Sequence, residues 1–187
     1  MEKKGIICFE TGQFASHRTD DEFYAKPLLD FIKDAWDVDV IYRQIATLQE
    51  LEFYLKQIGK ESFLKKYGII YLSFHGSKGA INLKGTGNVT LDYLMGTVAH
   101  YNSFYDRHVH FSSCETLKID EADIKDFKRN TGAASVSGYT KVVDGVSAYI
   151  NELAYFDQIM RFKSLSTIKE HMSNYQNQLD KLGFTLF

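Results

Sequence analysis

Short apolar runs alternate with amphipathic stretches along most of this chain. Five runs have the length and the Ile, Val, Phe and Tyr content of buried strands. These runs are Gly5–Phe9, Val38–Tyr42, Gly68–Phe74, Val109–Ser113 and Ala133–Tyr139. Between them, apolar residues recur at helical spacing. This β-α alternation predicts a three-layer α/β/α sandwich around a mainly parallel sheet with right-handed crossovers.

Local signals refine the boundaries of the predicted helices. Pro27 fits the first turn of a helix that begins near Lys26. Thr47 and Glu50 have the spacing of a capping box. Further helices are expected from Thr90 to Tyr101, around Ile124 and Phe127, from Val146 to Met160, and from Ile168 to Leu182, where Gly183 ends the last one.

Two smaller β features complete the predicted fold. Ile81–Leu83 and Val89–Leu91 flank Gly85-Thr86-Gly87 and predict a small hairpin after the third strand. Phe184–Phe187 predicts an edge strand at the end of the chain. Residues 1–187 contain no repeat or linker-like stretch, so we expect one domain.

Composition excludes several classes of function. Of the 187 residues, 44% are hydrophobic and 25% charged, and the net charge is -2. This balance gives no electrostatic reason to expect nucleic acid or an anionic membrane as a partner. No apolar stretch approaches the roughly 18 residues that a spanning helix needs. With two cysteines and no export signal, we expect reduced thiols in a cytoplasmic protein.

The candidate chemistry lies at the ends of two predicted strands. His75 follows the run Gly68–Phe74, and Cys114 follows Val109–Ser113. Because parallel strands present their carboxyl ends at one edge of the sheet, a base and a thiol are expected at the same edge. A thiol beside an imidazole is the minimum machinery of a cysteine hydrolase.

Around these residues the chain resembles the caspase-like cysteine peptidases, and in particular their CHAT branch. The resemblance rests on Phe74-His75-Gly76, on Phe111-Ser112-Ser113-Cys114-Glu115-Thr116 and on the downstream strand Thr131–Tyr139, followed by Val143-Asp144. It covers roughly residues 5–160. The family pattern implies a caspase-like sheet in a short stand-alone domain of the kind found in bacteria.

The resemblance also implies roles for individual residues. Cys114 would be the nucleophile and His75 the general base and acid, with no metal or cofactor. The backbone N–H groups of Gly76 and Cys114 would form the oxyanion hole. The substrate would be a protein or peptide. An activating partner or small-molecule signal, in stress or antiphage defence, would order the loops Glu10–Asp21 and Thr140–Gly145.

Three residues are candidates for substrate binding. Asp144 could receive a basic side chain, or it could cap the following helix. Arg18 lies in the loop after the first strand, where caspases place an aspartate-binding arginine, but the local sequence departs from their pattern. Glu115 adjoins the thiol, and since an acid disfavours a thiolate, we expect it to point away or to contact substrate.

The remaining histidines and Cys8 carry weaker signals. His108 and His110 bracket the start of the Cys114 strand and are interpreted as structural or solvated, since no acidic or thiol partner completes a metal site. His17, His100 and His171 show no supporting pattern. Cys8 is interpreted as a small buried hydrophobe.

Two alternative functions remain open. One is a caspase-fold sensor or scaffold without turnover, favoured by the absence of a clear specificity residue. The other is a flavodoxin-like nucleotide binder, suggested by fold class alone. Gly85-Thr86-Gly87 does not support the latter, because it lacks the third glycine of a dinucleotide fingerprint and does not open a helix directly after a strand.

Overall fold

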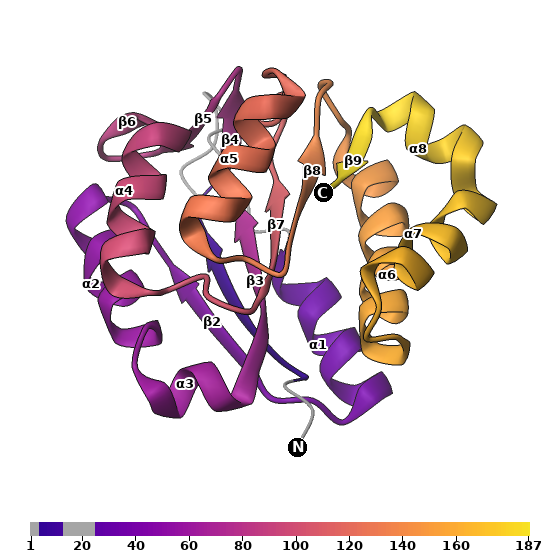
Figure 1. Cartoon of the computed structure of the whole chain (residues 1–187), viewed down its shortest axis with the longest axis horizontal. Coiled ribbons are helices and arrows are strands. Elements are labelled where there is room, and N and C mark those ends of the chain that lie inside the picture. The colour runs from indigo at the N-terminus through magenta and orange to yellow at the C-terminus, as the bar shows by residue number, and fades with distance from the viewer. Residues whose placement is uncertain (1–3, 13–24) are drawn as a thin grey trace.

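A computed structural model describes residues 4–12 and 25–187, and its centre is a six-stranded sheet (Figure 1). The strand order is β2-β1-β3-β7-β8-β9, with all neighbours parallel except the antiparallel pair β8 and β9. The strands are β1 (Gly5–Glu10), β2 (Val40–Gln44), β3 (Tyr67–Ser73), β7 (His108–Ser112), β8 (Ser135–Tyr139) and β9 (Phe184–Leu186). The predicted mainly parallel sheet is therefore confirmed.

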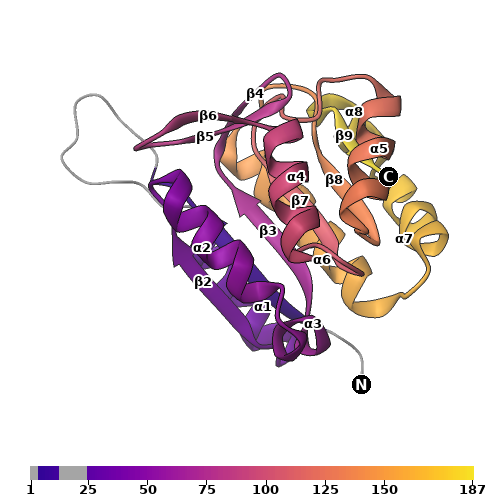
Figure 2. The same cartoon turned by 60° about the vertical axis from the view of Figure 1, so that its left-hand side comes forward.

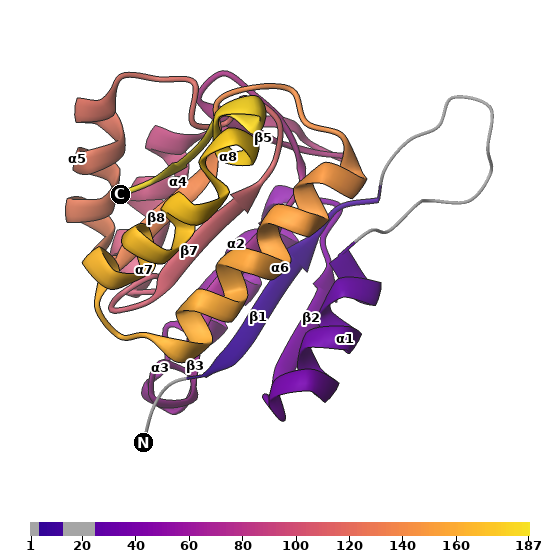
Figure 3. The same cartoon turned by 90° about the vertical axis from the view of Figure 1, so that its right-hand side faces the viewer.

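Helices cover both faces of this sheet and form the two outer layers of the sandwich (Figures 2 and 3). One face carries α2 (Leu48–Ile58), α4 (Leu91–Tyr101) and α5 (Glu121–Thr131), and the other carries α1 (Ala25–Trp36), α6 (Gly145–Arg161), α7 (Leu165–Met172) and α8 (Gln176–Leu182). Alternation along β1 divides the core, since Ile7 and Phe9 join the first cluster and Ile6 and Cys8 the second.

The signals at the ends of helices act as the sequence predicts. Thr47 accepts a hydrogen bond from the N–H of Glu50, and the Glu50 carboxylate accepts one from the N–H of Thr47, so both halves of the capping box are present. Gly183 adopts a φ of 64° after α8, a left-handed conformation that glycine reaches without steric cost.

The predicted helix from Ile168 to Leu182 is wrong in one respect, because it is two helices. A 3₁₀ turn, η1 (Ser173–Tyr175), separates α7 from α8. The hydroxyl of Ser173 donates to the carbonyl oxygen of Glu170 at 2.6 Å. Serine and asparagine compete for backbone hydrogen bonds in this way, which favours a helix end. The short helix α3 (Glu61–Lys66) was not predicted, since it buries none of its residues.

The predicted hairpin is part of a separate three-stranded antiparallel sheet. Its order is β4-β5-β6, with β4 (His75–Ser77), β5 (Ala80–Leu83) and β6 (Gly87–Thr90). Since β3 ends at Ser73, His75 does not close that strand but begins β4, with Asn82 as its register partner. The small sheet therefore starts at the histidine.

Candidate functional site

The register of two neighbouring strands brings His75 and Cys114 to the same place. In the parallel pair of β3 and β7, Ser73 is opposite Ser112. His75 lies two residues beyond Ser73, and Cys114 lies two residues beyond Ser112. Both residues therefore lie just beyond the carboxyl edge of the sheet, as expected from the sequence.

His75 is exposed at this edge, and within residues 4–12 and 25–187 no acidic side chain shifts the pKa of its ring. Protein atoms displace part of the water around the imidazole, and this partial burial lowers the pKa of His75 below its usual value of 6.5. The neutral imidazole is the form that accepts a proton. Partial burial therefore increases the fraction of neutral imidazole at neutral pH.

Cys114 lies in a turn after β7 and is partly buried. Its Sγ accepts a hydrogen bond from the N–H of Val143 at 3.5 Å and lies 3.7 Å from the carbonyl oxygen of the same residue. His75 and Cys114, both described residues, are not hydrogen-bonded to each other. The thiol is therefore hydrogen-bonded to the segment between β8 and α6 and not to the imidazole.

Both residues line one cavity of about 470 Å³, which we call the Cys114 pocket. Its floor is formed by the ends of β3 and β7, and one wall by the start of α6. The lining residues are Ser73, Phe74, His75, Ser112, Ser113, Cys114, Val143, Asp144, Gly145, Val146, Ala148 and Tyr149. Such a volume is within the range of small-ligand sites.

Gly76 allows the two halves of the site to meet. A Cβ atom at this position would lie 2.3 Å from the carbonyl oxygen of Cys114 and 2.4 Å from Oγ1 of Thr116. Any larger residue would therefore push the histidine strand away from the cysteine turn. The absence of a side chain at Gly76 therefore permits close packing between β4 and the Cys114 turn.

The three candidate substrate residues have different surroundings. Asp144 lines the Cys114 pocket, but its carboxylate caps α6 by accepting the N–H of Ser147 at 2.9 Å, and this hydrogen bond lowers the pKa of Asp144. Glu115 has a φ of 55°, and its carboxylate pairs with Lys118 Nζ at 2.5 Å, away from the pocket. Arg18 and most of the loop Glu10–Asp21 lie outside the described residues.

A buried carboxylate adjoins the site, and sequence reasoning did not single it out. Glu10 is fully buried at the end of β1. It accepts hydrogen bonds from the N–H of Ala25 at 2.9 Å, the hydroxyl of Tyr42 at 2.7 Å and Oγ of Ser73 at 3.2 Å. Since Ser73 lines the Cys114 pocket, Glu10 ties its floor to the first turn of α1. The only sequence signal was an acid ending an apolar strand.

A second polar network lies beneath α6, within the sheet–helix interface. Glu152 is fully buried and accepts a hydrogen bond from the hydroxyl of Tyr71 at 2.6 Å. Nε2 of His110 lies 3.1 Å from Glu152, and Nδ1 of His110 lies 2.9 Å from Oγ of Ser137. Both ring nitrogens of His110 are thus occupied, which agrees with its interpretation as a structural residue.

Comparisons with known proteins place the chain in a family and a fold. A model of a family of unknown function, DUF6642, matches residues 3–187. The chain belongs to this family. The fold of this DUF6642 member is similar to that of the crystal structure of caspase-1 from Spodoptera frugiperda, with a TM-score of 0.57 at 11% sequence identity, covering 90% of this chain and 75% of that one. No curated protein matches the sequence.

These findings establish a caspase-like fold for this DUF6642 member. At 11% identity the likeness concerns the fold alone. Over residues 4–12 and 25–187, no helix has the length and apolar character required to cross a membrane. The same part of the chain contains no cluster of three or more histidine, cysteine or acidic side chains suited to a metal ion.

Proposed function

We propose that this DUF6642 member is a caspase-like cysteine peptidase of the CHAT type, with Cys114 as nucleophile and His75 as general base and acid. The observation that carries the proposal is the shared position of the two residues. Each lies two residues beyond the paired Ser73 and Ser112, and both line one cavity. The caspase-like fold supports the same reading.

In the proposed reaction, His75 takes the proton of the Cys114 thiol as Sγ attacks the carbonyl carbon of the peptide bond. The carbonyl oxygen becomes an oxyanion, which the N–H groups of Gly76 and Cys114 stabilise. The C–N bond then breaks, and His75 returns the proton to the leaving amine, which leaves a thioester. Water, deprotonated by His75, hydrolyses that thioester and frees the thiol.

The walls of the Cys114 pocket favour an apolar substrate side chain. Val143, Val146, Ala148 and Tyr149 contribute to its lining, whereas Asp144 is engaged as the cap of α6. Val146 is 72% exposed, so the apolar surface continues outward from the cavity. We therefore propose cleavage next to an apolar residue rather than a basic one.

The contacts of the thiol suggest that the site has a low basal activity, which a signal or partner would raise. Sγ of Cys114 is held by the backbone of Val143, within the predicted loop Thr140–Gly145. Moving this segment would release the thiol toward His75. A signal or partner with that effect would suit the stress or antiphage role that the CHAT resemblance implies.

The decisive experiment is a screen of peptides that vary only at the residue before the cut. Wild-type protein should cleave after apolar residues, and Cys114→Ala should reduce kcat/KM by at least about 10³-fold. Since the pKa of His75 is lowered, the acid limb of the pH profile should lie below pH 6.5. Cys8→Ala is the control, because Cys8 is fully buried away from the site. Wild-type activity equal to that of Cys114→Ala would contradict the proposal.

A second candidate, a binding module without turnover, is favoured by the missing hydrogen bond between His75 and Cys114. The discriminating measurement is the rate at which iodoacetamide alkylates Cys114. A peptidase site should react faster than a free peptide thiol at pH 7 and should slow in His75→Ala. A rate equal to that of the peptide thiol, unchanged in His75→Ala, would favour the binding module.

A further inference from the structure

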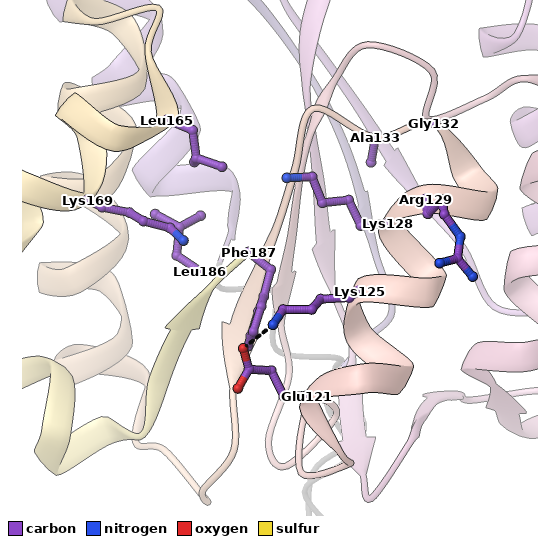
Figure 4. Close-up of a pocket in the computed structure, with 10 residues that line it drawn as sticks. All are labelled: Glu121, Lys125, Lys128, Arg129, Gly132, Ala133, Leu165, Lys169, Leu186 and Phe187. Carbon is purple, nitrogen blue, oxygen red and sulfur yellow. Dashed lines mark ion pairs between the residues drawn. The ribbon is translucent and has the colours of Figure 1, made fainter.

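A second cavity of about 690 Å³ lies on the flank of the molecule, away from the residues of the Cys114 pocket. It is bounded by α5, by α7 and by the end of the chain at β9 (Figure 4). We call it the α5–α7 pocket. No residue of the proposed peptidase site lines it, so its chemistry requires a separate explanation.

Positive side chains reach this pocket from two helices. Lys125 and Lys128 come from α5 and Lys169 comes from α7, whereas the guanidinium of Arg129, also on α5, is directed away from Phe187 in Figure 4. In Figure 4, Lys128 and Lys169 extend toward each other across the cavity. Glu121 is the one acidic side chain of the lining, so the four cations exceed the side-chain acids by three. A terminal carboxylate at Phe187 would reduce this excess to two.

Within the described part of the chain, two of these cations form ion pairs and two do not, although the charge of Lys169 adds to the effect of Lys125 in lowering the pKa of Glu121. Lys125 pairs with Glu121 at 2.6 Å, and Arg129 pairs with Asp126 at 2.8 Å. Over residues 4–12 and 25–187, no acidic group lies within ion-pair distance of Lys128 or Lys169. Burial and the nearby charge of Lys169 together lower the pKa of Lys128. Repulsion between two unpaired ammonium groups is relieved when an anion lies between them.

The remaining lining is apolar. Leu165 from α7 and Leu186 with Phe187 from the end of the chain border the same cavity as the lysines. In Figure 4 the ring of Phe187 lies between α5 and α7, beside the side chain of Lys125. The pocket thus offers separated charge and an aromatic surface, which together suit a ligand with an anionic part and a flat apolar part.

We propose that the α5–α7 pocket binds a small phosphorylated ligand with an aromatic ring, that is, a nucleotide. Lys128 and Lys169 would hold the phosphates from opposite sides, and Phe187 would contact the base. The volume of about 690 Å³ is within the range of small-molecule sites, which favours a small molecule over a nucleic-acid duplex or a membrane surface. The net charge of -2 also gives the molecule as a whole no general attraction to polyanions.

Binding of magnesium-free ATP, inorganic pyrophosphate and adenosine, measured by isothermal titration calorimetry, tests this proposal. ATP should bind most tightly, pyrophosphate more weakly and adenosine weakest, and affinity should fall as salt concentration rises. Lys128→Glu and Lys169→Glu should each weaken ATP binding by at least about tenfold. Lys128→Gln should weaken ATP binding less than Lys128→Glu. This variant can be used for the test if Lys128→Glu or Lys169→Glu fails to fold.

Lys56→Glu is the matched control, because Lys56 is an exposed lysine on α2 and the substitution changes net charge equally. Absence of ATP binding at millimolar concentration would overturn the proposal, as would equal weakening by Lys56→Glu. Tighter binding of a DNA duplex or of anionic vesicles would overturn the choice of ligand class. None of these outcomes depends on peptidase activity, since Cys114→Ala protein can be used throughout.

Discussion

The Cys114 pocket and the α5–α7 pocket are built in different ways. The first is fixed by backbone, because strand register sets the positions of His75 and Cys114 and a glycine contact joins their segments. The second is formed by side chains from α5, α7 and β9, which are separated in sequence and meet only through packing. The meeting of residues at strand ends can thus be predicted from sequence, whereas a cavity formed between helix surfaces cannot.

Acid should lower the free energy of unfolding of this protein. The largest expected contribution from a single residue is that of His108, which lies near Lys128. Burial, with a smaller contribution from nearby Lys128, lowers the pKa of His108 to about 4. The unfolded chain therefore binds a proton between pH 6.5 and pH 4 that the folded protein excludes. Above pH 6.5, His108 should not reduce the free energy of unfolding. As the pH drops to 4, its titration should lower that free energy by about 3 kcal/mol.

Urea unfolding of wild type and His108→Gln at pH 7 and pH 4 measures this loss. Glutamine retains a polar contact for Ser135, whose Oγ lies 2.7 Å from Nδ1 of His108. The variant should lose about 3 kcal/mol less than wild type over this range, whereas exposed His100→Gln should behave as wild type. Parallel pH dependence in wild type and His108→Gln would disprove the assignment.

In the Cys114 pocket, the close contact between Gly76 and the carbonyl group of Cys114 should be broken by one added methyl group. Gly76→Ala forces a Cβ against the carbonyl oxygen of Cys114, so we expect about 2 kcal/mol of destabilisation and loss of cleavage. ATP binding at the α5–α7 pocket should be unchanged in the folded fraction. Thermal unfolding, peptide cleavage and calorimetry measure the three effects.

Gly96→Ala is the matched control, since a Cβ there meets nothing within 4 Å on an exposed turn of α4. That substitution should be neutral or stabilising, because alanine is the better helix former by up to about 1 kcal/mol. If Gly76→Ala were as stable and as active as Gly96→Ala, the close packing at Gly76 would contribute neither to stability nor to cleavage.

The smallest expected effect concerns the apolar character of the Cys114 pocket. Val146 is 72% exposed, so Val146→Asp should change stability by less than about 0.5 kcal/mol. It should lower kcat/KM for peptides with an apolar residue before the cut by about tenfold, and Val146→Leu should not. Equal activity of Val146→Asp and wild type across the peptide series would show that this wall does not select substrate.

Most of the framework could be predicted from local sequence. The capping box of Thr47 and Glu50, Pro27 in the first turn of α1 and the six strands of the main sheet follow from short-range patterns. What could not be predicted depends on tertiary structure. The helix break at Ser173 and the antiparallel β4 at His75 arise where local hydrogen bonding and strand pairing override the apolar pattern.

The buried acids show the same limit at the level of side chains. Glu152 occurs within an amphipathic helix and Glu10 at the end of an apolar strand, and neither pattern indicates burial. Their partners, Tyr71 for Glu152 and Tyr42 for Glu10, are 81 and 32 residues away in sequence. Only the folded sheet brings them into hydrogen-bond distance. The peptidase roles of His75, Gly76 and Cys114 stay predictions that the experiments above address.

The order of the main sheet has a consequence for the synthesis of the chain on the ribosome. After β1 and β2, the strands β3, β7, β8 and β9 are added on one side of the sheet in the order of their translation. Each new parallel strand can therefore pair with an edge that is already present, and none must be inserted between two formed strands. The edge that carries His75 and Cys114 is assembled while β9 is still to come, and the α5–α7 pocket is completed last.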